Sequence, residues 1–174
     1  RRRAEGQNTI AIDPAAEPYP DQDVRAVAQL VEAKSAPDRA FAAVDLGGIS
    51  EKLLRAKRGV LLYAHRSVAV VQDELQLTEP GQAVWGAYTE AKVIRNGGRY
   101  LLLERGGKIL LCRIYGGGNA KFEVLPVEGT ALSRLVIRVD AKEKLRLAVA
   151  FAMTDTPDAK LYELQPMTKW VELQ

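Results

Sequence analysis

The sequence has very little of two residue types on which active sites commonly depend. It contains one cysteine, Cys112, and one histidine, His65, among 174 residues. A single cysteine excludes a disulfide within the chain, and a single histidine excludes metal motifs built on a histidine pair and argues against a Ser-His-Asp triad. Because Cys112 lies within an apolar run, we expect a buried structural cysteine rather than a nucleophile. His65 is expected at a strand end or in a turn.

Long hydrophobic runs and a large charge imbalance are also missing. No apolar run approaches the roughly 18 residues of a membrane-spanning helix, so no membrane association is expected. The net charge is only +3, and the aromatic residues, 6% of the chain, are too scattered for a base-stacking platform, so we expect no nucleic-acid partner. The chain begins with Arg1 and shows no signal-peptide pattern, which indicates a module from within a larger protein.

What the sequence has in abundance is two-residue periodicity. A proline-rich and acidic loop over residues 14–23 follows a first strand at 9–13, and residues 24–34 fit either a helix by propensity or a strand by alternation. Because nearly everything downstream alternates, we favour the strand. Together with a tail strand that closes an edge, the pattern predicts a single all-β domain over 1–174, a two-layer antiparallel β-sandwich of about a dozen strands. The remaining predicted strands cover residues 40–46, 56–63, 67–77, 82–88, 91–95, 99–103, 108–115, 121–127, 134–139, 143–153 and 169–173.

Glycine pairs predict how three of these strands are connected. Gly97-Gly98 and Gly106-Gly107 supply the positive φ of tight hairpins and so predict a meander. Leu101–Leu103 and Ile109–Leu111 are apolar on both faces, which predicts strands covered from both sides and a central place for the meander. Gly116–Asn119 lacks the Lys-Ser/Thr of a phosphate-binding loop and is interpreted as a mobile connection.

Two adjacent acidic residues, Asp73 and Glu74, are candidates for a catalytic pair. Adjacent residues of a strand point to opposite faces, so the two carboxylates do not form a glycosidase pair by themselves. The residues alone therefore predict a β-sandwich module without naming its chemistry.

Five segments, in order along the chain, resemble the heparinase II/III-like polysaccharide lyases. The resemblance implies the β-sandwich part alone of such an enzyme, whose N-terminal helical toroid is missing from this sequence. It also implies a periplasmic or secreted parent that cleaves uronic-acid-containing polysaccharides, such as glycosaminoglycans, by β-elimination. In the family the toroid supplies a tyrosine and an Asn or His, so this chain alone is expected to be inactive. The segments are Arg2–Asp13, Ala42–Leu46, Lys57–Leu62, Val68–Leu75, and Val84-Trp85 with Thr89.

The resemblance also suggests site residues. The family places a histidine in the first strand of the sandwich, where this chain has Gln7, and glutamine does not shuttle protons at neutral pH. We therefore expect Arg3, Glu5, Gln7 and Asn8 to contact an acidic polysaccharide and to position it. An alternative is a non-catalytic carbohydrate-binding or structural module.

Some relatives hold a divalent metal such as zinc in this domain. Here Gln7, Asp21 or Asp23, and His65 occupy comparable places, so a metal site formed by them is a hypothesis. The alternative for the same residues is a hydrogen-bonded polar cluster that anchors the proline-rich loop.

Overall fold

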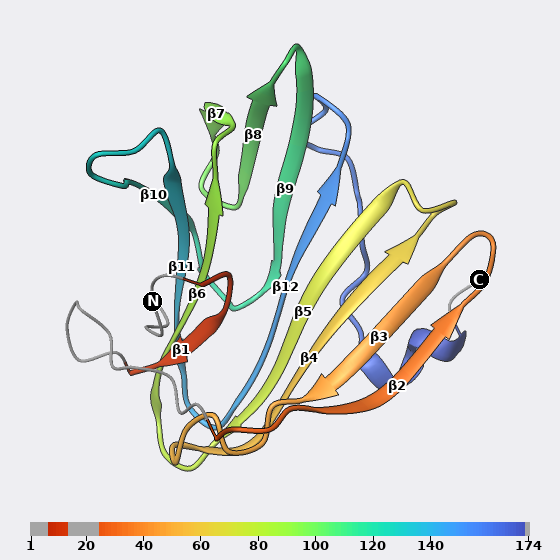
Figure 1. The fold of residues 1–174 in the computed structure, drawn as a ribbon, viewed down its shortest axis with the longest axis vertical. Coiled ribbons are helices and arrows are strands. Elements are labelled where there is room, and N and C mark those ends of the chain that lie inside the picture. The colour runs from red at the N-terminus through yellow and green to blue at the C-terminus, as the bar shows by residue number, and fades with distance from the viewer. Residues whose placement is uncertain (1–6, 14–24, 173–174) are drawn as a thin grey trace.

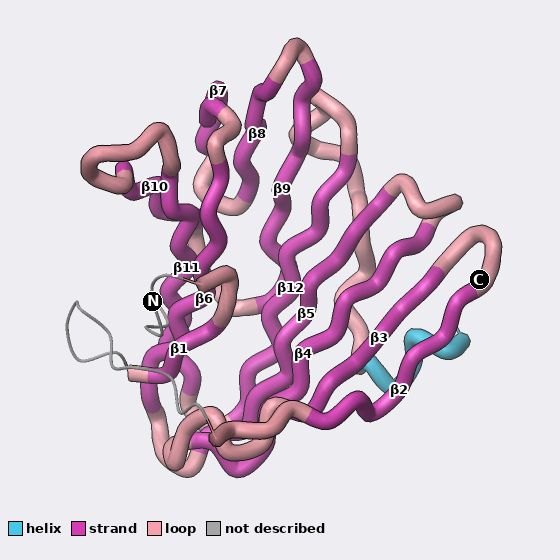
Figure 2. Tube along the Cα trace, viewed as in Figure 1, coloured by secondary structure: helices cyan, strands magenta, loops and turns pink. Residues whose placement is uncertain are grey.

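The computed structural model describes residues 7–13 and 25–172, and it confirms the all-β prediction. Within these residues the chain forms twelve strands and one short 3₁₀ helix (Figures 1 and 2). The elements are β1 (Ile10–Ile12), β2 (Gln29–Ser35), β3 (Ala40–Asp45), β4 (Leu53–Tyr63), β5 (Val68–Leu77), β6 (Gly81–Thr89), β7 (Lys92–Asn96), β8 (Tyr100–Arg105), β9 (Lys108–Gly116), β10 (Phe122–Pro126), β11 (Ser133–Ala141), β12 (Lys144–Ala152) and the 3₁₀ helix η2 (Met167–Glu172).

The strands form two antiparallel sheets of unequal size. The small sheet has the order β1-β6-β11-β10, and the large sheet has the order β2-β3-β4-β5-β12-β9-β8-β7. Figure 1 shows the small sheet against one part of the large sheet, with β2 to β5 extending away from it. The two-layer sandwich is thus confirmed, with one layer about half as wide as the other.

Alternating side chains place a hydrophobic core on each face of the large sheet. Leu75 and Leu147 of the large sheet pack with Trp85 and Ile137 of the small sheet in the core between the layers. On the opposite face lies a second core, which the segment after β12 covers with buried residues such as Trp170. That segment passes behind the large sheet in Figure 1. The large sheet is therefore covered on both faces over part of its width.

The meander prediction is half right. Leu101 and Leu103 face the core between the sheets, whereas Leu102 and Leu111 face the second core, so the expected coverage on both sides is confirmed. The predicted central position is wrong, because β7, β8 and β9 form one end of the large sheet. The central place belongs to β12, which pairs with β5 on one side and β9 on the other.

The structure also decides the two least certain strand predictions, those for residues 24–34 and 169–173. The strand preferred over a helix for residues 24–34 is confirmed in its second half, as the edge strand β2. The tail strand predicted over 169–173 is wrong, because residues Met167–Glu172 form η2 instead. The reason is the burial of Trp170: its indole fills a notch that Gly59 leaves open, where a Cβ would come within 2.5 Å of the ring.

Candidate functional site

Two of the four predicted substrate-binding residues, Gln7 and Asn8, lie on the surface immediately before β1. Pairing of Ile10 with Trp85 aligns β1 along β6 and so brings Asn8 to the far part of β6. There the side-chain oxygen of Asn8 accepts a hydrogen bond from the backbone N–H of Tyr88 at 2.9 Å. Arg3 and Glu5 lie outside the described residues, so their role stays a prediction.

Asn8 is also tied to the large sheet through an ion pair that the sequence did not reveal. The carbonyl oxygen of Asn8 accepts a hydrogen bond from Nη1 of Arg58 at 3.1 Å. The same guanidinium binds both carboxylate oxygens of Asp73, with Nε–Oδ1 at 2.8 Å and Nη2–Oδ2 at 2.9 Å. We call this set, Asn8, Arg58, Asp73 and the neighbouring Gln7, the junction site, because it links β1 of the small sheet to β4 and β5 of the large one.

The electrostatics of the junction site suit a structural clamp. The Asp73 side chain is fully buried, and its burial raises the pKa of the carboxyl, an effect that the Arg58 guanidinium partly offsets. The Arg58 side chain is 16% exposed, so its charge is largely used by Asp73. Local sequence patterns do not reveal this ion pair, because only the pairing of β4 with β5 sets Arg58 beside Asp73.

The exposed part of the junction site can bind and orient a ligand. Side-chain amides of Gln7 and Asn8 donate and accept hydrogen bonds but do not transfer protons. The single cysteine, Cys112, is fully buried, and burial raises the pKa of its thiol to about 12, so it stays protonated at neutral pH. The expectation of a buried structural cysteine is thereby confirmed.

The structure does not bring the described metal candidates together. His65 is exposed in the turn between β4 and β5. Gln7 instead precedes Asn8, which Arg58 contacts from the middle of β4. At about 3.3 Å per strand residue, the seven positions from Arg58 to His65 correspond to roughly 20 Å. Within residues 7–13 and 25–172, no group of three or more His, Cys, Asp or Glu side chains could hold a metal. Asp21 and Asp23 lie outside the described residues, so the metal hypothesis stays a prediction.

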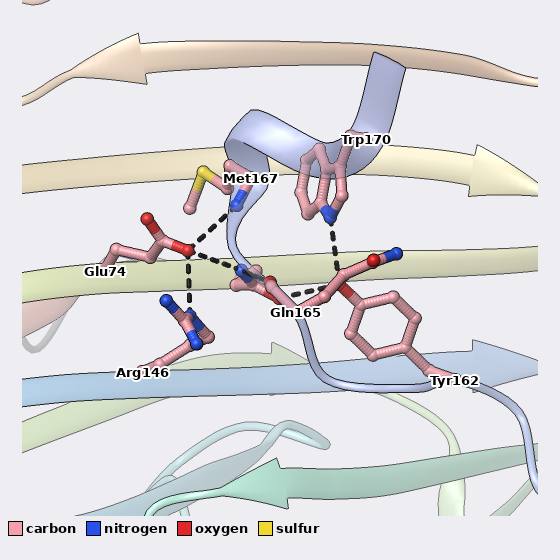
Figure 3. Close-up of polar contacts among 7 residues, drawn as sticks. Glu74, Arg146, Tyr162, Gln165, Met167 and Trp170 are labelled. Carbon is pink, nitrogen blue, oxygen red and sulfur yellow. Dashed lines mark hydrogen bonds and ion pairs between the residues drawn. The ribbon is translucent and has the colours of Figure 1, made fainter. Parts of the chain in front are cut away.

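A second polar cluster lies on the opposite face of the large sheet (Figure 3). Oε1 of Glu74 accepts hydrogen bonds from Nε of Arg146 at 2.9 Å, Nε2 of Gln72 at 3.0 Å and the backbone N–H of Met167 at 2.9 Å. Glu74 thus faces away from Asp73, as the strand period predicts.

The same cluster continues into the C-terminal segment. The hydroxyl of Tyr162 donates to Oε1 of Gln72 at 2.8 Å and accepts from Nε1 of Trp170 at 2.9 Å. Nε2 of Gln72 also donates to the carbonyl oxygen of Gln165 at 2.8 Å. Because these buried groups satisfy one another, the cluster fastens the C-terminal segment across the sheet. We call residues 153–172 the C-terminal strap.

The fold defines an antiparallel β-sandwich of the kind found in heparinase III. Solved structures similar to this chain include a heparinase III gene product (TM-score 0.69, 9% identity), another heparinase III (TM-score 0.68, 12% identity) and the heparan sulfate lyase HepC from Pedobacter heparinus (TM-score 0.70, 10% identity). They match 93%, 88% and 89% of this chain, respectively. These matches confirm, for the fold, the resemblance that the sequence segments suggest.

The likeness covers only part of the solved proteins. The chain spans 27%, 24% and 25% of their respective lengths, about a quarter in each case. No family model and no curated protein sequence matches the chain. Among the described residues, no helix is long and apolar enough to cross a membrane.

Proposed function

We propose that this chain is the β-sandwich part of a heparinase II/III-like lyase that cleaves an acidic, uronic-acid-containing polysaccharide by β-elimination. The observation that carries the proposal is the fold match, which takes in about nine-tenths of this chain but a quarter of each heparinase structure. In this proposal residues 1–174 form one domain that lines the substrate cleft. A helical toroid of the same parent protein, which is periplasmic or secreted, supplies the catalytic residues.

The junction site supports a positioning role within that cleft. Gln7 stands where the resemblance expects a histidine, and Asn8 is held from two sides by Tyr88 and Arg58. Side-chain amides can hydrogen-bond sugar hydroxyls and carboxylates without taking part in proton transfer. Arg3 and Glu5 complete the proposed contact set. One of the structural neighbours is named a heparan sulfate lyase, and a sulfated glycosaminoglycan is accordingly the first substrate to test.

The formation of unsaturated uronate tests whether the toroid, and not this chain, supplies the catalytic residues. The chain alone, incubated with heparan sulfate or alginate, is expected to give no unsaturated product, whereas the protein that carries the toroid gives it. Turnover by the chain alone would contradict the proposal.

In the toroid-bearing protein, Gln7→Ala is expected to raise KM with little change in kcat. The increase should be roughly threefold to tenfold, the value of one neutral hydrogen bond. Lys92→Ala, an exposed substitution on the edge strand β7, serves as the control and should change neither constant. A large fall in kcat with unchanged KM would show that Gln7 acts in the chemical step instead.

A non-catalytic carbohydrate-binding or structural module is the second candidate. It is favoured by the replacement of the expected histidine by Gln7. Binding of an acidic oligosaccharide by the chain alone, lost on Arg3→Ala or Gln7→Ala, would indicate a binding module. An absence of binding would indicate a purely architectural part.

A further inference from the structure

A groove of about 660 Å³ opens at one end of the sandwich, away from the junction site. Its lining residues come from the β9–β10 connection, from β11 and from the turn into β12. The β9–β10 connection crosses from the large sheet to the small one (Figure 1). On β6, Gln82 lies next to the groove residue Asp140, whereas Tyr88 contacts Asn8. These six residues of strand place Asp140 of the groove roughly 20 Å from Asn8 of the junction site, whereas Arg146 at the other side of the groove pairs with Glu74, next to Asp73.

The groove carries an excess of positive charge. Five cationic and two acidic side chains line it. The two arginines and both acids already have partners: Arg146 binds Glu74, Arg138 binds Glu123, and Asp140 accepts a hydrogen bond from Gln82. The lining cations are Lys121, Arg138, Lys142, Lys144 and Arg146.

Three exposed lysines remain to face a ligand. Lys144 lies 4.0 Å from Glu143, at the limit of an ion pair. Lys121 and Lys142 have no ion-pair partner within residues 7–13 and 25–172, and all three side chains are exposed. Exposed lysines that line a concave surface, two of them without a carboxylate partner among the described residues, raise the local potential and attract anions.

One wall of the groove is fixed by the protein rather than by a ligand. Arg99 donates hydrogen bonds to the carbonyl oxygens of Ile114, Gly116, Gly118 and Ala120, at 3.3, 2.8, 2.5 and 3.1 Å. Successive glycines at 116, 117 and 118 have φ of +74°, +62° and +57°, a backbone path open to glycine at little cost. These hydrogen bonds fasten residues 116–119, which the sequence had indicated as a mobile connection.

We propose that this groove is a second binding site of the chain, for the sulfate or carboxylate groups of an acidic polysaccharide. Its lining supplies lysine charges, and among the described residues that line it none is aromatic. Single-stranded nucleic acid binding depends on aromatic stacking, so this lining does not suit a single strand. The choice of a polysaccharide rests on the proposed function. Binding at two places along one chain would hold a long substrate in the cleft by effective concentration.

The affinity of the chain for a heparan sulfate oligosaccharide, measured by titration at several salt concentrations, tests the proposal. The double variant Lys121→Gln/Lys142→Gln is expected to weaken binding about tenfold and to reduce the slope of log Kd against log salt by about two, roughly one for each lost contact. The matched control, Lys92→Gln/Lys108→Gln, removes the same charge from exposed positions on β7 and β9 and should bind like the unchanged chain.

Each other outcome contradicts the groove in a recognisable way. Equal losses in both double variants would show a general charge effect. Unchanged binding in the groove variant, with loss on Gln7→Ala, would assign the ligand to the junction site, refute the groove and leave the proposed function intact. Tighter binding of a DNA duplex of equal charge would refute the polysaccharide assignment. Absence of binding by the unchanged chain would refute the groove as a binding site. The proposed function would then be tested separately, by measuring turnover by the toroid-bearing protein.

Discussion

His65 is the middle one of three consecutive residues that adopt a left-handed backbone conformation. Ala64, His65 and Arg66 have φ of 52°, 54° and 62°. For a residue other than glycine, each left-handed conformation lowers the stability of the folded state by about 1–2 kcal/mol. His65→Gly is therefore expected to raise the free energy of unfolding by about 1 kcal/mol, measured by urea denaturation.

Arg66 provides the contrasting control for this turn. Its guanidinium donates to the carbonyl oxygens of Pro37 and Ala36 and to Oγ of Ser35, which ties the β4–β5 turn to the β2–β3 turn. Arg66→Gly relieves similar strain but loses these bonds, so it should gain less than His65→Gly. A loss of stability on His65→Gly would show that the imidazole has a partner whose contribution exceeds the strain.

Arg58 makes the strongest residue-level prediction. Arg58→Ala leaves the Asp73 carboxylate buried without its counter-charge and is expected to cost about 3–5 kcal/mol of unfolding free energy. Because burial already raises the pKa of Asp73 in the folded state, the carboxyl protonates in the folded protein before it does in the unfolded chain. The loss caused by Arg58→Ala should therefore shrink as pH falls through the folded-state pKa.

A second variant distinguishes the ion pair from other consequences of the substitution. Arg58→Met/Asp73→Leu removes both charges and should recover most of the lost stability. The control Arg55→Ala, at an exposed position of the same strand, should change stability by less than about 0.5 kcal/mol. A pH-independent loss for Arg58→Ala would contradict the role assigned to Asp73.

Some of these residue-level features can be predicted from the sequence, and the others cannot, for a physical reason. The strand period alone places Asp73 and Glu74 on opposite faces, and an apolar context alone predicts a buried Cys112. The bond from Arg58 to Asn8 joins residues 50 positions apart, and it depends on the register of β4 with β5 and on the approach of the other sheet. Local patterns contain no information about such an approach.

At the scale of elements, the C-terminal strap is the part with the clearest mechanical role. Trp170→Ala empties the fully buried notch above Gly59 and is expected to cost about 3–5 kcal/mol in unfolding free energy. Gly59→Ala places a methyl group against the indole and should cost about 1–3 kcal/mol. Lys169→Ala, at the exposed neighbouring position, is the matched control. Thermal unfolding that is indifferent to Trp170→Ala would show that the strap does not stabilise the sheet.

Strand β1 is only three residues long, and the side chain of Asp13 fastens its end. Oδ1 of Asp13 accepts a hydrogen bond from the backbone N–H of Gln82 at 2.5 Å, and Oδ2 binds Nζ of Lys52 at 2.9 Å. These bonds lower the pKa of Asp13 below its ordinary value of 3.8. Their contribution to stability is present above pH 4 and is lost as pH falls through the lowered pKa.

The acid unfolding of Asp13→Asn tests this assignment. The variant should be less stable than the unchanged chain near pH 7, and the difference should narrow below pH 4. Asp155→Asn, in an exposed loop position, should show no such convergence. Parallel pH profiles for Asp13→Asn and the unchanged chain would contradict the anchoring role of Asp13.

Element identity was far easier to predict than element order. Most strands follow from alternation and glycine turns, because the two-residue period is a local property of the chain. The place of β12 between β5 and β9 follows from pairings that span up to 84 positions, such as Phe151 with Ala69 and Cys112. The strand predicted for the tail is wrong because the alternation around Trp170 resembles a short strand, whereas the burial of Trp170 against Gly59 depends on a distant part of the chain.

For the whole molecule, the large sheet depends on its last strand. A chain that ends at Ala141 lacks both β12 and the C-terminal strap, and it is expected to lose cooperative unfolding in circular dichroism. A peptide of residues 142–172 added in trans should restore a cooperative transition. Cooperative unfolding of the shortened chain at an unchanged midpoint would show that the two parts of the large sheet are stable without β12.

The position of β12 also has a consequence for biosynthesis. During translation β2 to β5 and β7 to β9 leave the ribosome before β12, which later joins them. Until residue 152 emerges, β5 and β9 each present an unpaired edge with apolar side chains, the kind of surface on which nascent chains aggregate. The yield of folded protein in cells should consequently depend on how quickly residues 144–172 follow, and on chaperones that cover those edges until β12 pairs with them.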